Sequence, residues 1–191
     1  MSLIKQTFEN ETFRNIDFTT SFDEATYEEC TFIQCKFNEV AFGKSYFVEC
    51  LFESCDLSLS DFKETAVQDV QFKQCKMMGT RFIDVNPFML SLQFADCQLT
   101  YASFQGIKHP AIRFRQCQLN EADFGLAHLP SGQFIGCDMS LAQFENTFLE
   151  KADFSGSYGF EINPEQNFIR HASFDRNTLG GLLTAYEINI Q

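Results

Sequence analysis

The chain has 191 residues, of which 45% are hydrophobic and 21% are charged, and this composition predicts a folded protein rather than a disordered tail. Its 26 acidic and 14 basic residues give a formal net charge of -12, which argues against a basic nucleic-acid-binding patch and against adhesion to an anionic membrane. No apolar run is long enough to span a bilayer, and the first residues lack the apolar core of an export signal, so we expect a cytoplasmic protein.

Phenylalanine recurs every five residues from the start of the chain. Phe8, Phe13 and Phe18 form a first short series, and the next phenylalanine, Phe22, comes one residue too early to continue it. Because one residue is missing from the period at this point, we expect an irregular first coil over residues 1–21.

Two longer series with the same period follow, and such regular repetition is the signature of a repeat architecture. The first consists of Phe22, Tyr27, Phe32, Phe37, Phe42, Phe47, Phe52, Leu57, Phe62, Val67, Phe72, Met77 and Phe82. The second consists of Phe94, Leu99, Phe104, His109, Phe114, Leu119, Phe124, Leu129, Phe134, Met139, Phe144, Leu149 and Phe154. Two extra residues separate the series near Asn86-Pro87, so we expect a small bulge near residues 84–92.

A small residue lies two positions before most of these centres, and all eight cysteines occupy that place. An extended backbone points residues two apart to the same side, so the small residue and the large centre both face inward. The residue between them faces outward, and the two residues after each centre, commonly polar or glycine, must turn the chain. We interpret the cysteines as reduced, packed thiols, because a spacing of five residues without paired histidines does not fit a zinc site.

If each unit turns the chain by a quarter circle, four units close a square coil of about 20 residues, and coils stack by parallel backbone pairing at ~4.8 Å. The cysteines support this coil length. Cys35, Cys55 and Cys75 lie 20 residues apart, and so do Cys97, Cys117 and Cys137. The spacing therefore predicts one interior column of six cysteines.

Units of a small residue, a polar residue, Phe or Leu, and two turn residues are typical of one family. The sequence resembles the pentapeptide-repeat proteins over about residues 6–175. The resemblance implies an all-β fold, a right-handed quadrilateral parallel β-helix with a short C-terminal helix/strand cap. We expect the β-helix over residues 1–175 and a cap or dimerisation segment over residues 176–191.

The repeat is lost after Phe174. Residues 175–186 predict a short helix, although Gly180 and Gly181 weaken it, and residues 187–191 alternate like a strand. A solenoid must cover its apolar end, so we expect this segment to form a cap or a dimer contact.

The polar residues show no catalytic arrangement. His109 is the one polar centre of the second series, and a structural role, either as a satisfied buried imidazole or within a locally swollen coil, is favoured over a catalytic one. Adjacent carboxylates such as Glu28 and Glu29 fall at turns that water reaches freely, so nothing shields a reaction. We therefore predict a protein that is not an enzyme, with no cofactor and no metal site.

Assigning the centres to four faces distributes the charges unevenly. The face that carries Phe62 and Phe104 has eight acids and three bases, whereas the opposite face, with Arg113 and Arg115, has five of each. The eight acids are our candidates for partner binding: Asp23, Glu24, Asp61, Glu64, Asp84, Asp123, Glu145 and Glu165. About eight coils at ~4.8 Å each make a stiff acidic rod of roughly 40 Å, a form suited to a basic groove made for DNA.

Within the family, the sequence is most similar to short bacterial members that protect DNA gyrase, which include quinolone-resistance, albicidin-resistance and microcin-immunity proteins. The likeness rests on residues 57–79, 159–165 and 179–190. It implies a DNA-mimicking rod that binds DNA gyrase or topoisomerase IV and modulates the enzyme or protects it from a poison such as a toxin or quinolone. Long projecting loops are not evident, which favours the toxin-immunity members. The alternative is a passive scaffold whose partner is unrelated to DNA.

The resemblance also implies how the chain associates with itself. In that group of proteins the terminal segment makes a homodimer. The residues that would carry the dimer contact here are Leu179, Leu182, Leu183, Tyr186, Ile188 and Ile190.

Overall fold

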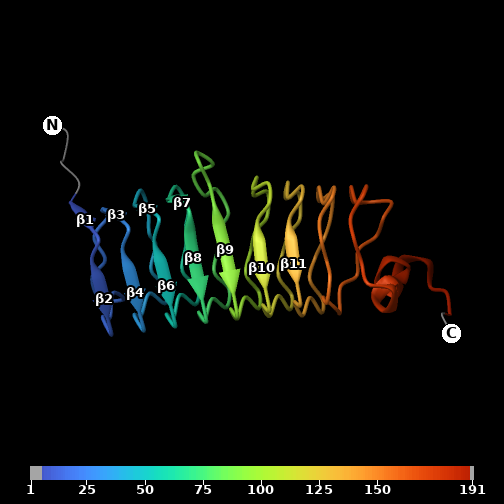
Figure 1. Ribbon diagram of the computed structural model, residues 1–191, viewed down its shortest axis with the longest axis horizontal. Coiled ribbons are helices and arrows are strands. Elements are labelled where there is room, and N and C mark those ends of the chain that lie inside the picture. The colour runs from blue at the N-terminus through green and yellow to red at the C-terminus, as the bar shows by residue number, and fades with distance from the viewer. Residues whose placement is uncertain (1–5, 190–191) are drawn as a thin grey trace.

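The computed structural model describes residues 6–189 and shows a right-handed quadrilateral parallel β-helix, which confirms the predicted fold class. Successive coils stack along one axis and form a straight rod, and the C-terminal helical segment closes one end (Figure 1). None of the helices within the described residues is both long and apolar enough to cross a membrane.

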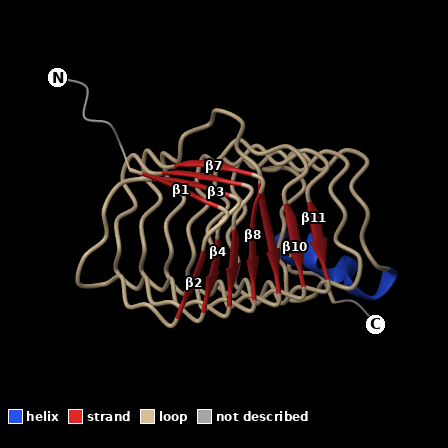
Figure 2. Cartoon of the chain, turned by 60° about the vertical axis from the view of Figure 1, so that its left-hand side comes forward, coloured by secondary structure: helices blue, strands red, loops and turns tan. Residues whose placement is uncertain are grey.

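Two sides of the rod contain short parallel strands, and Figure 2 shows them as two separate sheets. The first sheet contains β1 (Thr7–Glu9), β3 (Thr26–Glu28), β5 (Tyr46–Val48) and β7 (Ala66–Gln68). The second contains β2 (Thr12–Arg14), β4 (Thr31–Ile33), β6 (Leu51–Glu53), β8 (Val70–Lys73), β9 (Leu92–Ala95), β10 (Arg113–Arg115) and β11 (Gln133–Ile135). The other two sides are joined by single parallel bridges, such as that between Asp61 and Arg81.

The pairing register measures the length of each coil. Tyr46 pairs with Ala66, twenty residues later, which agrees with the predicted coil of four units. Thr7 pairs with Thr26 across only nineteen residues, where the repeat lacks one residue. Val70 of β8 pairs with Leu92 of β9 across twenty-two residues, where the repeat gains two.

Those two extra residues form a projecting loop in the segment between β8 and β9. Phe88 lies at this loop and is 73% exposed, and Met89 beside it is also exposed. Beyond the loop, His109 is buried and its Nε2 accepts a hydrogen bond from the backbone N–H of Leu92 at 2.7 Å. Its Nδ1 lies 3.1 Å from the carbonyl oxygen of Pro110. The imidazole is therefore a satisfied buried group that supports the strand after the loop.

The interior is filled as the five-residue pattern predicts. All eight cysteines are free and buried, and the thiol of Cys75 lies within hydrogen-bonding reach of its column neighbours Cys55 and Cys97. Aromatic centres stack from coil to coil, as where the rings of Phe94 and Phe114 lie 4.9 Å apart with an interplanar angle of 8°. The apolar surface that drives folding is therefore removed from water along the whole shaft.

Most corners of the rod turn on a residue with left-handed backbone geometry. This residue is usually the second turn residue of the unit, as at Glu64 (φ 62°), Leu126 (59°) and Gly106 (68°). Only glycine adopts this geometry without steric cost, and asparagine and aspartate adopt it more readily than other residues. Stacked coils hold the other residues in it through bonds such as that from the N–H of Glu64 to the carbonyl of Asp84, at 2.9 Å.

The C-terminal cap differs in part from the expectation. Two 3₁₀ helices, η1 (Arg176–Leu182) and η2 (Thr184–Tyr186), replace the single short helix. The strand expected over residues 187–191 is wrong as far as residue 189, because Glu187 has a φ of 50° and ends η2 in the left-handed conformation. Residues 190–191 lie outside the described part of the chain. Whether residues 176–191 form a unit distinct from the β-helix stays a prediction.

The cap is fixed to the last coil by backbone contacts. The N–H of Ile162 donates a hydrogen bond to the carbonyl of Gly181 at 2.9 Å. A Cβ at Gly181 would clash with the carbonyl oxygen of Phe160, so only glycine permits this close approach. Leu182 packs against the buried core and covers the apolar end of the rod.

Candidate interaction surfaces

The eight acidic candidates fall along one long side of the rod. Asp61 and Asp123 precede the buried centres Phe62 and Phe124 and belong to one ladder of bridges, which passes from Asp61 through Arg81 and Ser103 to Asp123. The other six lie at turns on this side and are exposed: Asp23, Glu24, Glu64, Asp84, Glu145 and Glu165. We call these eight residues the acidic face.

Two members of the acidic face hold the turn that follows them. A carboxylate oxygen of Asp61 accepts a hydrogen bond from the N–H of Lys63 at 2.9 Å. Asp123 does the same for the N–H of Gly125 at 2.8 Å. Such side-chain bonds to the backbone two residues later stabilise turns, so these two aspartates have a structural role besides their charge.

Bases on the same side offset part of the negative charge. Arg81 lies 3.8 Å from Asp61, and Lys44 lies 3.9 Å from Glu64. Exposed ion pairs of this kind contribute little to stability, but they make the local electrostatic potential less negative. Sequence counting placed these bases on the acidic face and did not show that they pair with its acids, because pairing depends on side-chain direction.

Glu165 links the acidic face to the cap. Its carboxylate accepts a hydrogen bond from the hydroxyl of Tyr186 at 2.8 Å, and this interaction raises the pKa of Tyr186. The repeat count placed Pro164 as a centre in this coil, but Ile162 is the fully buried residue and Pro164 is only half-buried. The quintet register is therefore interrupted at the segment that begins with Gly159, and it resumes at Ile169 and Phe174, which pack against the core.

The predicted dimer residues divide into two groups. Leu179, Tyr186 and Ile188 are exposed, by 42%, 47% and 56% respectively. Leu182 and Leu183 are half-buried, and Leu182 packs on the core. Ile190 lies outside the described residues. The exposed group is available to a partner surface, whereas Leu182 already serves the cap.

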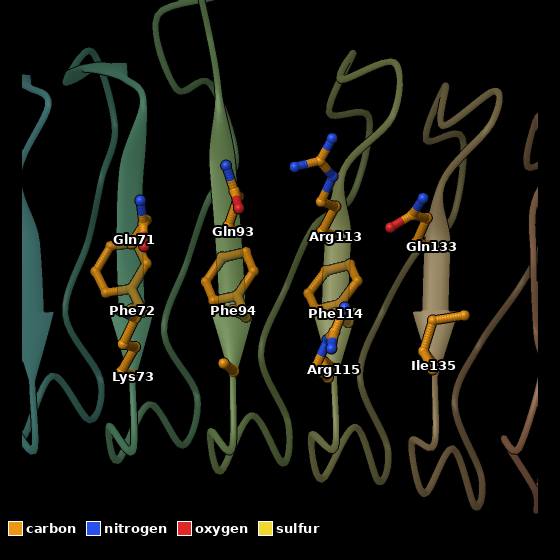
Figure 3. Close-up of a pocket in the computed structure, with 11 residues that line it drawn as sticks. Gln71, Phe72, Lys73, Gln93, Phe94, Arg113, Phe114, Arg115, Gln133 and Ile135 are labelled. Atoms are coloured by element: carbon orange, nitrogen blue, oxygen red, sulfur yellow. The ribbon is translucent and has the colours of Figure 1, made fainter.

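The side opposite the acidic face is the outer surface of the second sheet. Figure 3 shows its outward residues on neighbouring strands, with Gln71 and Lys73 on β8, Gln93 on β9, Arg113 and Arg115 on β10, and Gln133 and Ile135 on β11. Three cations therefore gather on this face, and its acidic neighbours are Glu53 and Asp153 in the same outward rows and Asp69 and Asp96 in the adjoining turns.

Burial opposes ionisation of the thiol of Cys50. Burial raises the pKa of Cys50 to about 12, which keeps this thiol protonated at neutral pH. Within residues 6–189, no group of histidine, cysteine and carboxylate side chains is arranged to hold a metal ion. That the protein is not an enzyme and uses no cofactor stays a prediction.

Comparisons with known proteins agree with the fold. A family model described as the pentapeptide repeat region matches residues 25–104 and 45–124, which together span just over half of the chain. A trypsin-treated variant of QnrB1, a plasmid-mediated fluoroquinolone resistance protein, superposes with a TM-score of 0.63 at 20% identity, over 97% of this chain and 92% of that one. A second trypsin-treated QnrB1 variant gives a TM-score of 0.52 at 18% identity, over 98% of both chains. No curated protein matches this chain significantly.

Proposed function

This chain belongs to the pentapeptide-repeat family, and on that basis we propose that it is a cytoplasmic, DNA-mimicking rod that binds a type II topoisomerase. The enzyme would be DNA gyrase or topoisomerase IV, held through the acidic face in place of DNA. Binding would modulate the enzyme or protect it from a poison such as a toxin or a quinolone. The rod would act by occupying the DNA-binding groove of the topoisomerase and would catalyse no reaction.

One observation carries the proposal: a straight shaft presents carboxylates along one side at intervals set by the coil repeat. Coils stack at ~4.8 Å, so the shaft is roughly 40 Å long. Duplex DNA carries one negative charge per ~1.7 Å of axis, so the same length of DNA carries about twenty-odd charges. The net charge of -12 on the chain is a fair fraction of that value.

The similarity to QnrB1 gives the proposal its direction. QnrB1 is described as a fluoroquinolone resistance protein, and its variants share the rod-like fold of this chain. Because the sequence identity is only 20%, the shared fold suggests a comparable form of action rather than the same drug. We extend to this chain the role of protecting an enzyme, and experiment must identify the poison against which it protects.

A homodimer through the cap completes the proposal. Leu179, Tyr186 and Ile188 expose apolar surface beyond the last coil, at the end of the rod. Pairing two caps would bury these side chains and double the length of the acidic surface.

Sedimentation of the wild type is expected to give a dimer, and Leu179→Asp with Ile188→Asp is expected to give a monomer with an unchanged far-UV spectrum. A wild type that sediments as a monomer at micromolar concentration would contradict the homodimer.

Binding to purified DNA gyrase and topoisomerase IV tests the central proposal. The test variant carries Glu64→Lys, Asp84→Lys and Glu145→Lys, which avoid the turn-forming Asp61 and Asp123. The control variant carries Glu29→Lys, Glu49→Lys and Asp69→Lys, which change the net charge equally at a different corner of the rod.

We expect the wild type to bind at least one of the two enzymes at low salt and to lose affinity as salt increases, because ionic contacts are screened. The test variant should lose at least tenfold in affinity, and the control variant should lose less than threefold. Equal losses in both variants would show that net charge alone matters and would favour a scaffold without a defined DNA-like face. No binding of the wild type to either enzyme at low salt would reject the proposal.

A further inference from the structure

A shallow hollow of about 330 Å³ lies on the outer surface of the second sheet, opposite the acidic face. It is lined by residues of β8, β9, β10 and β11, and the pairing register places the small side chain of Ala95 between Lys73 and Arg115. Ala95 leaves space there because its neighbours in the same outward row are long. This volume is at the lower end of the range for small-molecule sites.

The hollow is cationic on a chain that is acidic as a whole. Lys73, Arg113 and Arg115 are exposed, and none of them forms an ion pair with another described residue. Gln71, Gln93 and Gln133 add side-chain amides in the row that contains Arg113. The acidic face lies on the opposite side of the shaft, and charges beyond a Debye length of about 8 Å at physiological salt are largely screened. On the same face, Glu53 of β6 pairs in register with Lys73, and Asp96 follows Ala95, so the positive potential is centred on Arg113 and Arg115.

We propose that this hollow binds a compact anion with several phosphate groups, such as a triphosphate, free or carried by a nucleoside. Arginine guanidinium groups bind phosphate oxygens through paired hydrogen bonds, and lysine adds a point charge. Arg113 and Arg115 are two residues apart on β10, so their Cα atoms are ~7 Å apart. Lys73 lies two strands away on β8, so its Cα atom is ~10 Å from that of Arg115. A single carboxylate reaches one of these cations, whereas a chain of linked phosphates reaches several.

The size of the hollow favours a small ligand over a nucleic acid. A duplex would approach the whole rod, most of which repels it, whereas a compact anion enters only the cationic part. Ala95 and Ile135 supply an apolar floor where the linking atoms of a small ligand can rest. The site is independent of the proposed topoisomerase contact, because it lies on the opposite side of the rod.

Calorimetric titration of the full-length protein with inorganic triphosphate at low ionic strength tests the proposal. We expect one site per chain, saturable binding, and a raised melting temperature, since a ligand that binds only the folded state stabilises it. Triphosphate should bind at least tenfold more tightly than citrate, which also carries several negative charges. Citrate binding as tightly as triphosphate would reject the phosphate assignment, and no saturable binding of triphosphate would reject the site.

Three variants separate the hollow from general electrostatics. Arg115→Gln should weaken triphosphate binding at least tenfold, whereas Arg14→Gln, on β2 of the same sheet and outside the hollow, should change it less than twofold. Ala95→Leu leaves the charge unchanged but fills the hollow, and it should also weaken binding at least tenfold. Equal effects of Arg115→Gln and Arg14→Gln, or unchanged binding by Ala95→Leu, would overturn the proposal.

The source of the phosphates is resolved by comparing ATP with inorganic triphosphate, both without magnesium. Tighter binding of ATP would assign the site to nucleotides, and tighter binding of triphosphate would assign it to free oligophosphates. Either result supports the proposed chemistry. Binding of the topoisomerase by Arg115→Gln should remain at the wild-type level, so failure at one surface is distinguishable from failure at the other.

Discussion

The two opposite sides of the rod share one interior, yet their outward residues carry different charge. Beneath the acidic face, Phe82 and Phe104 stack at 5.0 Å, and beneath the cationic hollow, Phe72 and Phe94 stack at 5.2 Å. Above these similar columns, the outward residues carry opposite charge. The comparison shows that inward positions determine the solenoid, while outward positions are free to encode recognition.

The strongest test of this comparison changes the shared interior. Phe94→Ala and Phe104→Ala should each destabilise the protein by about 3–5 kcal/mol, because each removes a fully packed ring and leaves a cavity. Chemical denaturation monitored by circular dichroism measures both values. Costs that differ by more than about 2 kcal/mol would contradict the equivalence of the two interior columns.

A smaller effect is expected at His109, a polar residue among the buried centres. His109→Leu should cost about 1–3 kcal/mol, because the buried N–H of Leu92 loses its acceptor. The same equilibrium unfolding measurement gives this value. A cost below about 0.5 kcal/mol would show that the imidazole is not needed to support the strand after the loop.

His109 also predicts a pH dependence of stability. Burial lowers the pKa of His109 in the folded state below its ordinary value near 6.5, so the unfolded chain binds the proton more readily. The contribution of the neutral imidazole is therefore complete above about pH 6.5 and is lost as pH falls below it. Unfolding free energies measured between about pH 5 and 7 should fall with acid in the wild type more steeply than in His109→Leu. Identical slopes in the two proteins would contradict this account.

The corners of the rod predict a third, smaller effect. A Cβ added at Gly106 meets no atom within 4 Å, so Gly106→Ala changes only the backbone preference at a φ of 68°. We expect a loss of about 1 kcal/mol in unfolding free energy. Gly106→Asn should lose less, because asparagine tolerates this conformation better. Equal losses for alanine and asparagine would indicate a cause other than backbone geometry.

The smallest effect on stability is expected at the outward positions. Gln143→Lys on the acidic side and Gln133→Glu in the lining of the hollow each change the charge of one side and lie just before a buried phenylalanine. Both should change the unfolding free energy by less than about 0.5 kcal/mol. A larger change at either position would show that surface charge also contributes to holding the coils together.

The sequence was sufficient for the β-helix and its interior because the pattern repeats over many coils. The spacing of Phe32, Phe52 and Phe72 predicts their register, and Cys75 follows from the same count. The hydrogen bond from Leu92 to His109 joins residues on either side of an irregular loop, and no period relates them. The hollow above Ala95 depends on the lengths of neighbouring outward side chains, which vary freely between coils.

The cap shows a second limit of reasoning from sequence. Alternation over residues 187–191 predicts a strand, yet Glu187 adopts a left-handed conformation that ends η2. Gly181 lies against the carbonyl of Phe160, and this contact fixes the path of η1 over the last coil. Local propensity was overridden by the need to cover the apolar end of the rod.

Competition with DNA for a type II topoisomerase tests the central claim most directly. Fluorescently labelled duplex DNA bound to DNA gyrase, and in parallel to topoisomerase IV, is titrated with the rod at low salt while anisotropy is recorded. We predict that the wild-type rod displaces the duplex from at least one of the two enzymes and that the variant with Glu64→Lys, Asp84→Lys and Glu145→Lys does not. A rod that binds the enzyme while the duplex stays bound, or that displaces it equally well after charge reversal, would contradict DNA mimicry.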